Sequence, residues 1–178
     1  MTRRYALSVG TWFSFTPLLF AFQGEERKRV SPHETVSVDL GNGSVSITYG
    51  RPYLKGRKVG QQVAPFDQVW RLGADEATKL TVPVAMKLGS VNLTPGSYAL
   101  FAIPGDEKWT IIVNKVADQW GAFDYDQSKD LGRFVVNVEK LLKPVEEFTV
   151  SLDKQSSKAA KVTFAWGGES VSTTLTAS

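Results

Sequence analysis

Apolar and polar residues alternate along much of the chain from about residue 36 onward. The alternation is clearest in residues 36–40 and 45–49, which flank the glycine-containing sequence 41–43. Because the side chains of a strand point to opposite faces in turn, a period of two predicts a strand with one buried face. Two such stretches separated by a short turn predict an antiparallel hairpin.

Similar patterns predict further strands near residues 78–84, 85–91, 97–103, 109–115, 134–140, 147–152, 161–166 and 170–176. Turn sequences separate several of these strands, and Gly167-Gly168 predicts a two-residue hairpin between the last two. No apolar segment after residue 34 keeps a helical period over three turns. The sequence therefore predicts an all-β fold: a single antiparallel β-sandwich, jelly-roll-like or a partly closed barrel.

Two longer connections interrupt this pattern, at residues 50–77 and 114–133. We refer to them as the first and second connections. Long loops on a rigid sheet often carry binding or catalytic residues. We therefore expect any functional site in these two segments.

The N-terminal residues have the layout of a secretory signal peptide. A short basic start precedes an uncharged, mostly apolar stretch at 5–22, and a charged run follows it. This predicts a signal peptide at 1–24, a polar linker at 25–34 and one β-sandwich domain at 35–178, in the periplasm or outside the cell. An uncleaved membrane anchor is the alternative, although Pro17 and several polar residues weaken a segment that is barely long enough to span a membrane.

The charge and the cysteine content exclude several classes of function. The chain has 21 basic and 18 acidic residues, and the expected signal peptide removes Arg3 and Arg4 but no acid. The mature part is then nearly neutral, so nothing favours nucleic-acid binding. The chain has no cysteine, which excludes disulfides, thiolate metal sites and a catalytic cysteine.

The first connection ends in Val69–Thr78, a sequence with a tryptophan, an arginine and two adjacent carboxylates. If they are buried, Arg71 and Glu76 need each other or another partner, because an unpaired buried charge is costly. A structural salt bridge and a direct ligand contact are both open for this pair. Trp70 suits either the core or a platform for a ligand.

Basic residues gather earlier in the first connection, at Arg51, Lys55, Arg57 and Lys58. Guanidinium groups bind anions such as sulfate, phosphate or sugar acids. The alternative is a solvated loop in which Arg51 or Arg57 pairs with an acid. Arg51 directly follows a predicted strand, so its side chain is the more directed of the two.

The second connection combines rings with amides. Trp120 and Tyr125 lie near Asn114 and Gln119. Flat rings and amides are the groups that a saccharide site uses, but the same groups pin a long loop onto a sandwich. Both interpretations are open.

The sequence gives little support for a metal site or a cofactor site. His33 is the only histidine and falls in the expected linker, which argues against a zinc site or a serine–histidine–aspartate triad. Residues 124–130 have alternating oxygen ligands but lack the glycine and the final glutamate of a calcium loop. We therefore expect no metal and no cofactor. If the protein is an enzyme, its acid and base would be Glu76 with Asp75 or Asp124, in a carboxylate-dependent hydrolysis.

Several blocks in the chain resemble one known family, and together they extend over about residues 36–176. They are Tyr49-Gly50-Arg51-Pro52, Lys55-Gly56-Arg57-Lys58, Val69-Trp70-Arg71, Gly73-Ala74-Asp75-Glu76-Ala77-Thr78, Pro95-Gly96-Ser97-Tyr98-Ala99-Leu100-Phe101, Ile103-Pro104-Gly105, Trp109-Thr110-Ile111-Ile112, Asn114-Lys115, Gln119-Trp120-Gly121-Ala122-Phe123 and Tyr125-Asp126. In this order they are similar to the bacterial domain of unknown function 2911 family. The resemblance implies an exported β-sandwich without an established activity. Asp75 stands where most members have asparagine.

Three functions follow from these patterns. The first is a non-catalytic module that binds a small polar or anionic ligand, such as a saccharide, through residues of both connections. Its expected contacts are Arg51, Arg57, Trp70, Arg71, Glu76, Asn114, Trp120 and Tyr125. The second is the carboxylate-dependent hydrolase, and the third is a purely structural envelope protein. Contact with a membrane is expected only if the N-terminal segment stays uncleaved, and the sequence does not indicate a protein partner.

Overall fold

The structure is a computed structural model that describes residues 28–40 and 43–177. The expected signal peptide, residues 1–24, lies outside the described residues. The strands are β1 (His33–Asp39), β2 (Ser44–Gly50), β3 (Val59–Gly60), β4 (Val63–Pro65), β5 (Thr78–Val82), β6 (Met86–Leu88), β7 (Val91–Leu93), β8 (Gly96–Ile103), β9 (Lys108–Asn114), β10 (Asp130–Lys154) and β11 (Ala159–Ala177). One short 3-10 helix, η1 (Gln127–Lys129), precedes β10. In this part of the chain, no helix is long and apolar enough to cross a membrane.

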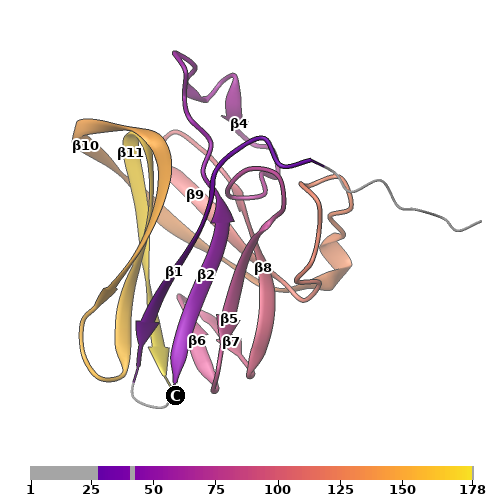
Figure 1. The fold of residues 1–178 in the computed structure, drawn as a ribbon, viewed down its shortest axis with the longest axis vertical. Helices are drawn as coiled ribbons and strands as arrows, with labels where there is room; N and C mark the ends of the chain where they lie inside the picture. The colour runs from indigo at the N-terminus through magenta and orange to yellow at the C-terminus, as the bar shows by residue number, and fades with distance from the viewer. Residues whose placement is uncertain (1–27, 41–42, 178) are drawn as a thin grey trace, which may run out of the picture.

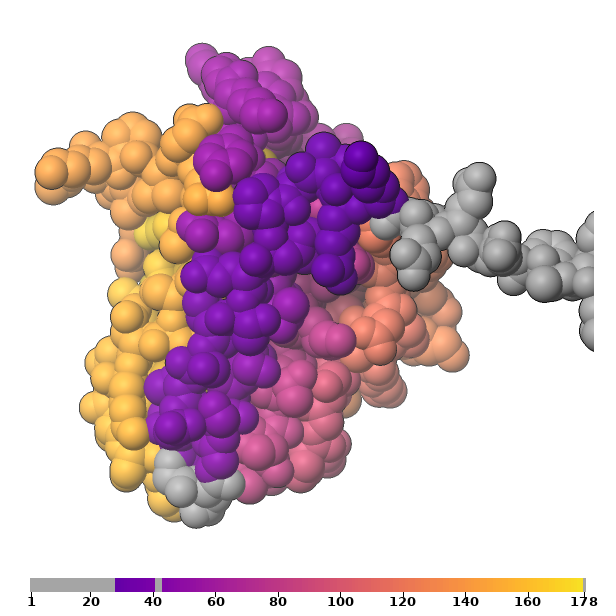
Figure 2. Space-filling view, viewed as in Figure 1, coloured from indigo at the N-terminus to yellow at the C-terminus, as the bar shows by residue number. Residues whose placement is uncertain are grey.

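Nine strands form one antiparallel sheet in the order β1-β2-β5-β8-β9-β10-β11-β6-β7 (Figure 1). The predicted first hairpin is confirmed: β1 and β2 pair from His33 opposite Gly50 to Asp39 opposite Ser44. β1 begins two residues before the expected start of the domain. β3 and β4 form a small parallel pair within the first connection, which projects from one end of the molecule (Figure 2).

The long strand β10 gives the sheet its two layers. Its first part, Asp130–Asn137, pairs with β9, and its later part, Val138–Lys154, pairs with β11. The sheet therefore folds over, with β1, β2, β5, β8 and β9 in one layer and β11, β6 and β7 in the other (Figure 1). β1 and β7 end the strand order, so the sheet does not close into a barrel. The prediction of an all-β, antiparallel fold is confirmed.

Aromatic side chains fill the space between the layers. Trp70 packs against three rings: it is stacked on Trp166 at 5.6 Å and meets Trp109 and Phe148 edge-on, at 5.8 and 5.2 Å. Tyr49 extends the cluster through Phe148. All five side chains are buried. Large rings supply much of the apolar area that a domain without disulfides needs for stability.

The predicted hairpin at Gly167-Gly168 is wrong. β11 continues through both glycines, and β10 likewise joins the two strands predicted near 134–140 and 147–152. Gly167 has a φ of 62° and pairs with Val145 between two register shifts. A glycine in this left-handed conformation is typical of a β-bulge, which bends a strand without reversing it. The sequence does not distinguish this bulge from a turn.

Candidate functional site

The two connections meet along residues 75–77. Ala77 donates its backbone N–H to the carbonyl of Gln119, and Gly121 donates to the carbonyl of Asp75. Glu76 and Trp120 thereby form an isolated antiparallel bridge. A Cβ atom at Gly50 would overlap the carbonyl oxygen of Ala74, so only glycine lets the end of β2 approach this segment so closely.

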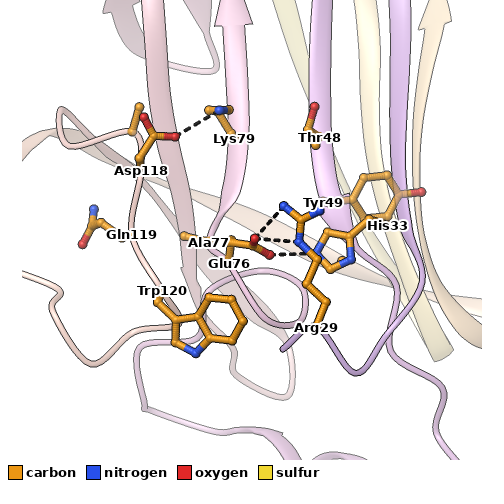
Figure 3. A pocket seen from close by; sticks show the side chains of 12 residues that line it. Arg29, His33, Thr48, Tyr49, Glu76, Ala77, Lys79, Asp118, Gln119 and Trp120 are labelled. Atoms are coloured by element: carbon orange, nitrogen blue, oxygen red, sulfur yellow. Dashed lines mark hydrogen bonds and ion pairs between the residues drawn. The ribbon is translucent and has the colours of Figure 1, made fainter. Parts of the chain in front are cut away.

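A pocket of about 360 Å³ opens beside this junction, and we call it the polar pocket. Its charged lining residues are Arg29, His33, Glu76, Lys79 and Asp118. Trp120 adds a half-buried ring, and the end of β2 contributes Thr48, Tyr49 and Gly50. In Figure 3 the ring of Trp120 lies below Glu76, and the Lys79–Asp118 pair lies above it.

Glu76 is the centre of a charged cluster formed with Arg29 and His33, the Glu76 cluster. Arg29 donates to Oε1 of Glu76 from Nε at 2.7 Å and forms an ion pair with it from Nη2 at 2.6 Å. Nε2 of His33 lies 2.8 Å from Oε2 of the same carboxylate. Nδ1 of His33 lies 3.0 Å from the carbonyl oxygen of Ser31. Because a neutral imidazole can donate from only one nitrogen, both bonds form when the ring is protonated or when Glu76 carries the proton.

The ionised form of Glu76 is favoured by its partners. Partial burial acts to raise the pKa of this carboxyl group, but the hydrogen bonds from Arg29 and His33 outweigh it and lower the pKa. A second ion pair in the pocket joins Nζ of Lys79 to Oδ1 of Asp118 at 3.0 Å. All three basic side chains of the polar pocket therefore face a carboxylate.

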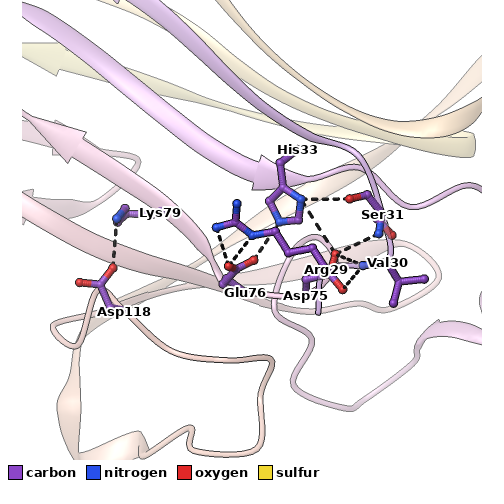
Figure 4. A network of polar contacts seen from close by, with 8 residues as sticks. All are labelled: Arg29, Val30, Ser31, His33, Asp75, Glu76, Lys79 and Asp118. Atoms are coloured by element: carbon purple, nitrogen blue, oxygen red, sulfur yellow. Dashed lines mark hydrogen bonds and ion pairs between the residues drawn. The ribbon is translucent and has the colours of Figure 1, made fainter. Parts of the chain in front are cut away.

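Asp75 fixes the chain segment that delivers Arg29 and His33. Its buried carboxylate accepts hydrogen bonds from the backbone N–H groups of Val30 and Ser31, at 3.1–3.2 Å (Figure 4). Asp75 has a φ of 61°, a conformation that is uncommon for a residue other than glycine. The described part of the expected linker thus contributes two side chains to the pocket.

Arg71 and Glu76 do not form the salt bridge that the sequence suggested. Glu76 is bonded to Arg29 and His33, whereas no ion pair of Arg71 occurs among the described residues. Arg71 instead lines a second pocket of about 310 Å³, which shares no lining residue with the first. Burial lowers the pKa of Arg71, and the nearby charge of Asp75 only partly opposes this effect. Trp70 belongs mainly to the core, where its Nε1 donates to the carbonyl of Gly73.

The other two candidate arginines have structural contacts. Arg51 forms ion pairs with Glu34 at 2.9 Å and Glu147 at 3.1 Å, and so ties the end of β2 to β1 and β10. Arg57 donates from Nε and Nη2 to the carbonyls of Leu54 and Tyr53 within its own loop, and it also lines the second pocket. Neither residue lines the polar pocket.

Asn114 and Tyr125 hold the second connection in place. The buried amide of Asn114 donates to Asp126 and Asp130 and accepts from Val116 and Gln119. The hydroxyl of Tyr125 donates to Asp130 at 2.8 Å, and its ring packs on Phe101. Partial burial and this bond raise the pKa of Tyr125 to about 12.

Of the possible catalytic carboxylates, only Glu76 lines the polar pocket. Asp75 is buried behind it, and Asp124 is exposed and lines neither pocket. Among the described residues, no group of three or more histidine, aspartate or glutamate side chains could hold a metal ion.

Sequence reasoning missed Arg29, His33, Lys79 and Asp118. Arg29 and His33 reach Glu76 from 47 and 43 residues away, a contact that no local pattern encodes. A usable signal was the position of His33, the only histidine in the sequence, three residues before the first alternating stretch. Lys79 is the outward-facing residue next to the buried Thr78 in β5, and it directly follows the sequence Val69–Thr78.

Comparison with known proteins gives one match. A family model described as "Protein of unknown function (DUF2911)" matches residues 31–175. No curated protein matches the chain. No solved structure matches it.

Proposed function

This chain belongs to the DUF2911 family of proteins of unknown function, and from the geometry of its polar pocket we propose what it does. It is an exported, non-catalytic module that binds a small polar ligand, and an uncharged saccharide is the ligand class that fits best. Export rests on the pattern of the first 24 residues, which has the order of a secretory signal peptide.

The observation that carries this proposal is the combination of a ring with paired charges in one pocket. Trp120 offers an apolar face, and the Glu76 cluster and the Lys79–Asp118 pair place donors and acceptors around it (Figure 3). A saccharide presents apolar C–H faces and hydroxyl groups that both donate and accept, so it can use all of these groups. The volume of about 360 Å³ lies at the lower end of the range for small-molecule pockets, about 300–1,000 Å³.

The pairing of charges favours an uncharged ligand over a charged one. An anion would have to compete with Glu76 for Arg29 or with Asp118 for Lys79, and a cation would have to displace one of those basic groups. Hydroxyl groups can instead bond to the edges of existing ion pairs without leaving a charge unpartnered, which is the costly outcome.

Two observations weigh against the hydrolase alternative. Hydrolysis of a glycoside requires a carboxyl group whose pKa is raised so that it can act as an acid. The pKa of Glu76 is lowered, because its hydrogen bonds outweigh its burial. The two suggested partners are also misplaced, since Asp75 is occupied by backbone N–H groups and Asp124 lies outside the pocket.

The proposal is tested by calorimetric titration of the full chain with a panel of neutral mono- and disaccharides. We expect saturable binding of at least one member, weakened about fivefold or more by Trp120→Ala, because the loss of one aromatic stacking contact costs about 1–3 kcal/mol. Phe123→Ala is the matched control: it removes an exposed ring from the same connection that does not line the pocket. A folded protein that binds none of the panel, or binds equally well without Trp120, would sink the proposal in favour of a structural role.

A further inference from the structure

The second pocket differs from the polar pocket in the state of its charges. We call it the arginine pocket because Arg57 and Arg71 are its charged lining residues. No aspartate or glutamate is among its lining residues in the described part of the chain. Whereas each basic side chain of the polar pocket faces a carboxylate, the two arginines here line a cavity of about 310 Å³.

Arg71 has an unsatisfied donor. Its Nε atom is buried and has no hydrogen-bond partner among the described residues. Asp75 is the acidic residue whose charge acts on it, but that carboxylate accepts from Val30 and Ser31 instead. A buried donor on a charged group that lacks a partner is costly, and such groups are rare unless something binds them.

Arg57 is fixed in orientation without being neutralised. Two of its nitrogens donate to backbone carbonyls of its own loop, at 2.9 and 2.7 Å, and no ion pair of Arg57 occurs among the described residues. These carbonyl bonds hold the guanidinium in place but leave its charge for another partner. Two guanidinium groups at one cavity form a strong attraction for an oxyanion, because each can donate two parallel bonds.

Apolar residues form part of the wall of the arginine pocket. They include Val63, Pro65, Val69 and the edge of the core tryptophans Trp70 and Trp166. An inorganic ion would leave this apolar surface unused, whereas an organic anion could place its charge on the guanidinium groups and its apolar part on the wall.

The backbone around the cavity is held in uncommon conformations. Ala64, which lines it, has a φ of 44°, and Leu72, between Arg71 and Gly73, has a φ of 53°. Residues other than glycine adopt such angles at a cost, and they cluster where binding requires a particular geometry.

We propose that the arginine pocket is a second binding site, distinct from the polar pocket, that takes a small organic carboxylate with an apolar or aromatic portion. The carboxylate lies on the guanidinium group of Arg71, which has no ion pair among the described residues, and Arg57 adds a second cationic contact. The apolar portion packs against Val69 and the tryptophan edge. This site does not depend on saccharide binding in the polar pocket.

The test is a calorimetric titration of the full chain with benzoate as the probe. Benzamide, which has the same ring but no charge, is titrated as the control ligand. We expect saturable binding of benzoate and at least about tenfold weaker binding of benzamide, because only the anion satisfies the guanidinium groups. Arg71→Gln should weaken benzoate about tenfold or more. Lys58→Gln removes a neighbouring exposed charge that does not line the pocket, and it should leave the affinity within about twofold.

Three results would overturn the proposal: no saturable binding of benzoate, equal binding of benzamide, or unchanged affinity in Arg71→Gln. Tighter binding of inorganic phosphate than of benzoate would overturn the assignment to a carboxylate. If Arg71→Gln does not fold, Ala122→Leu narrows the cavity while both arginines stay, and it should cause the same loss of benzoate binding. Titrating the same variants with saccharides separates this site from the polar pocket, since the two share no lining residue.

Discussion

Glu76 joins three parts of the chain that are far apart in sequence. It receives hydrogen bonds from Arg29 and His33 at the N-terminal side of β1, and its backbone bridges to Trp120 in the second connection. The sequence could predict that Glu76 pairs with a basic group, because a buried carboxylate needs a partner for its charge. Its partner could not be predicted, because Arg71 and Lys79 are the basic residues close to it along the chain, whereas Arg29, 47 residues away, is the one paired with it in the structure.

The free energy of unfolding at acid pH should depend on the ionisation of the Glu76 carboxyl group. The pKa of Glu76 is lowered below its ordinary value of 4.5, so its ionised form stabilises the fold. That contribution is complete above about pH 4.5 and is lost as the pH falls through the lower pKa of the folded state. We therefore expect the gap in unfolding free energy between the wild type and Glu76→Gln to shrink as the pH falls from about 6 to about 3.

Urea denaturation at a series of pH values measures this gap. Glu107→Gln serves as the control, because Glu107 is exposed and its side chain has no ion pair among the described residues. The difference in unfolding free energy between the wild type and Glu107→Gln should stay small at every pH. A gap for Glu76→Gln that is constant, or that widens toward acid, would contradict the role assigned to the Glu76 cluster.

At the scale of elements, β10 and β11 show where sequence patterns mislead. The alternation correctly located most of their residues, but Gly167-Gly168 predicted a chain reversal. In the structure Gly167 lies opposite Val145 of the neighbouring strand, at an irregularity in the pairing. A bulge and a turn require the same residue types, so the outcome depends on pairing partners that the local sequence does not specify.

The bulge requires a left-handed backbone conformation at Gly167. Because its φ is 62°, Gly167→Ala should lower the free energy of unfolding by about 1–2 kcal/mol through backbone strain, although no atom lies closer than 3.6 Å to the added Cβ. Gly168→Ala is the matched control, since Gly168 is exposed, lacks a positive φ and has open space at its Cβ. It should change stability by no more than about 0.5 kcal/mol. Equal effects in chemical denaturation would mean that Gly167 does not carry the bulge.

At the scale of the whole molecule, the sequence predicted the all-β class and the positions of the two connections. It did not predict that the residues of the first connection divide between two pockets. This division arises because Arg71 and Glu76 lie on a short segment whose turns at Leu72 and Asp75 have positive φ angles. Such turns direct neighbouring side chains to different surroundings. Trp70, Asn114 and Tyr125 are instead used in packing, the alternative that the sequence had left open.

The two pockets of the protein differ in whether their charged side chains are paired. The polar pocket has paired charges beside a ring, and the arginine pocket has two guanidinium groups without a carboxylate in its described lining. The aromatic core fills the space between the two layers, and Trp70 anchors the first connection in it.

The central claim, that Trp120 forms one wall of a saccharide site, is tested most directly by the indole N–H resonances of the full, ¹⁵N-labelled chain during titration with the neutral saccharide panel. Trp70, Trp109, Trp120 and Trp166 are the tryptophans in the described residues, and three of them are buried in the core. The account predicts a saturable shift of the Trp120 resonance while those of Trp70, Trp109 and Trp166 stay in place. A Trp120 resonance that does not move with any saccharide, or a saturable shift at Trp166 instead, would contradict it.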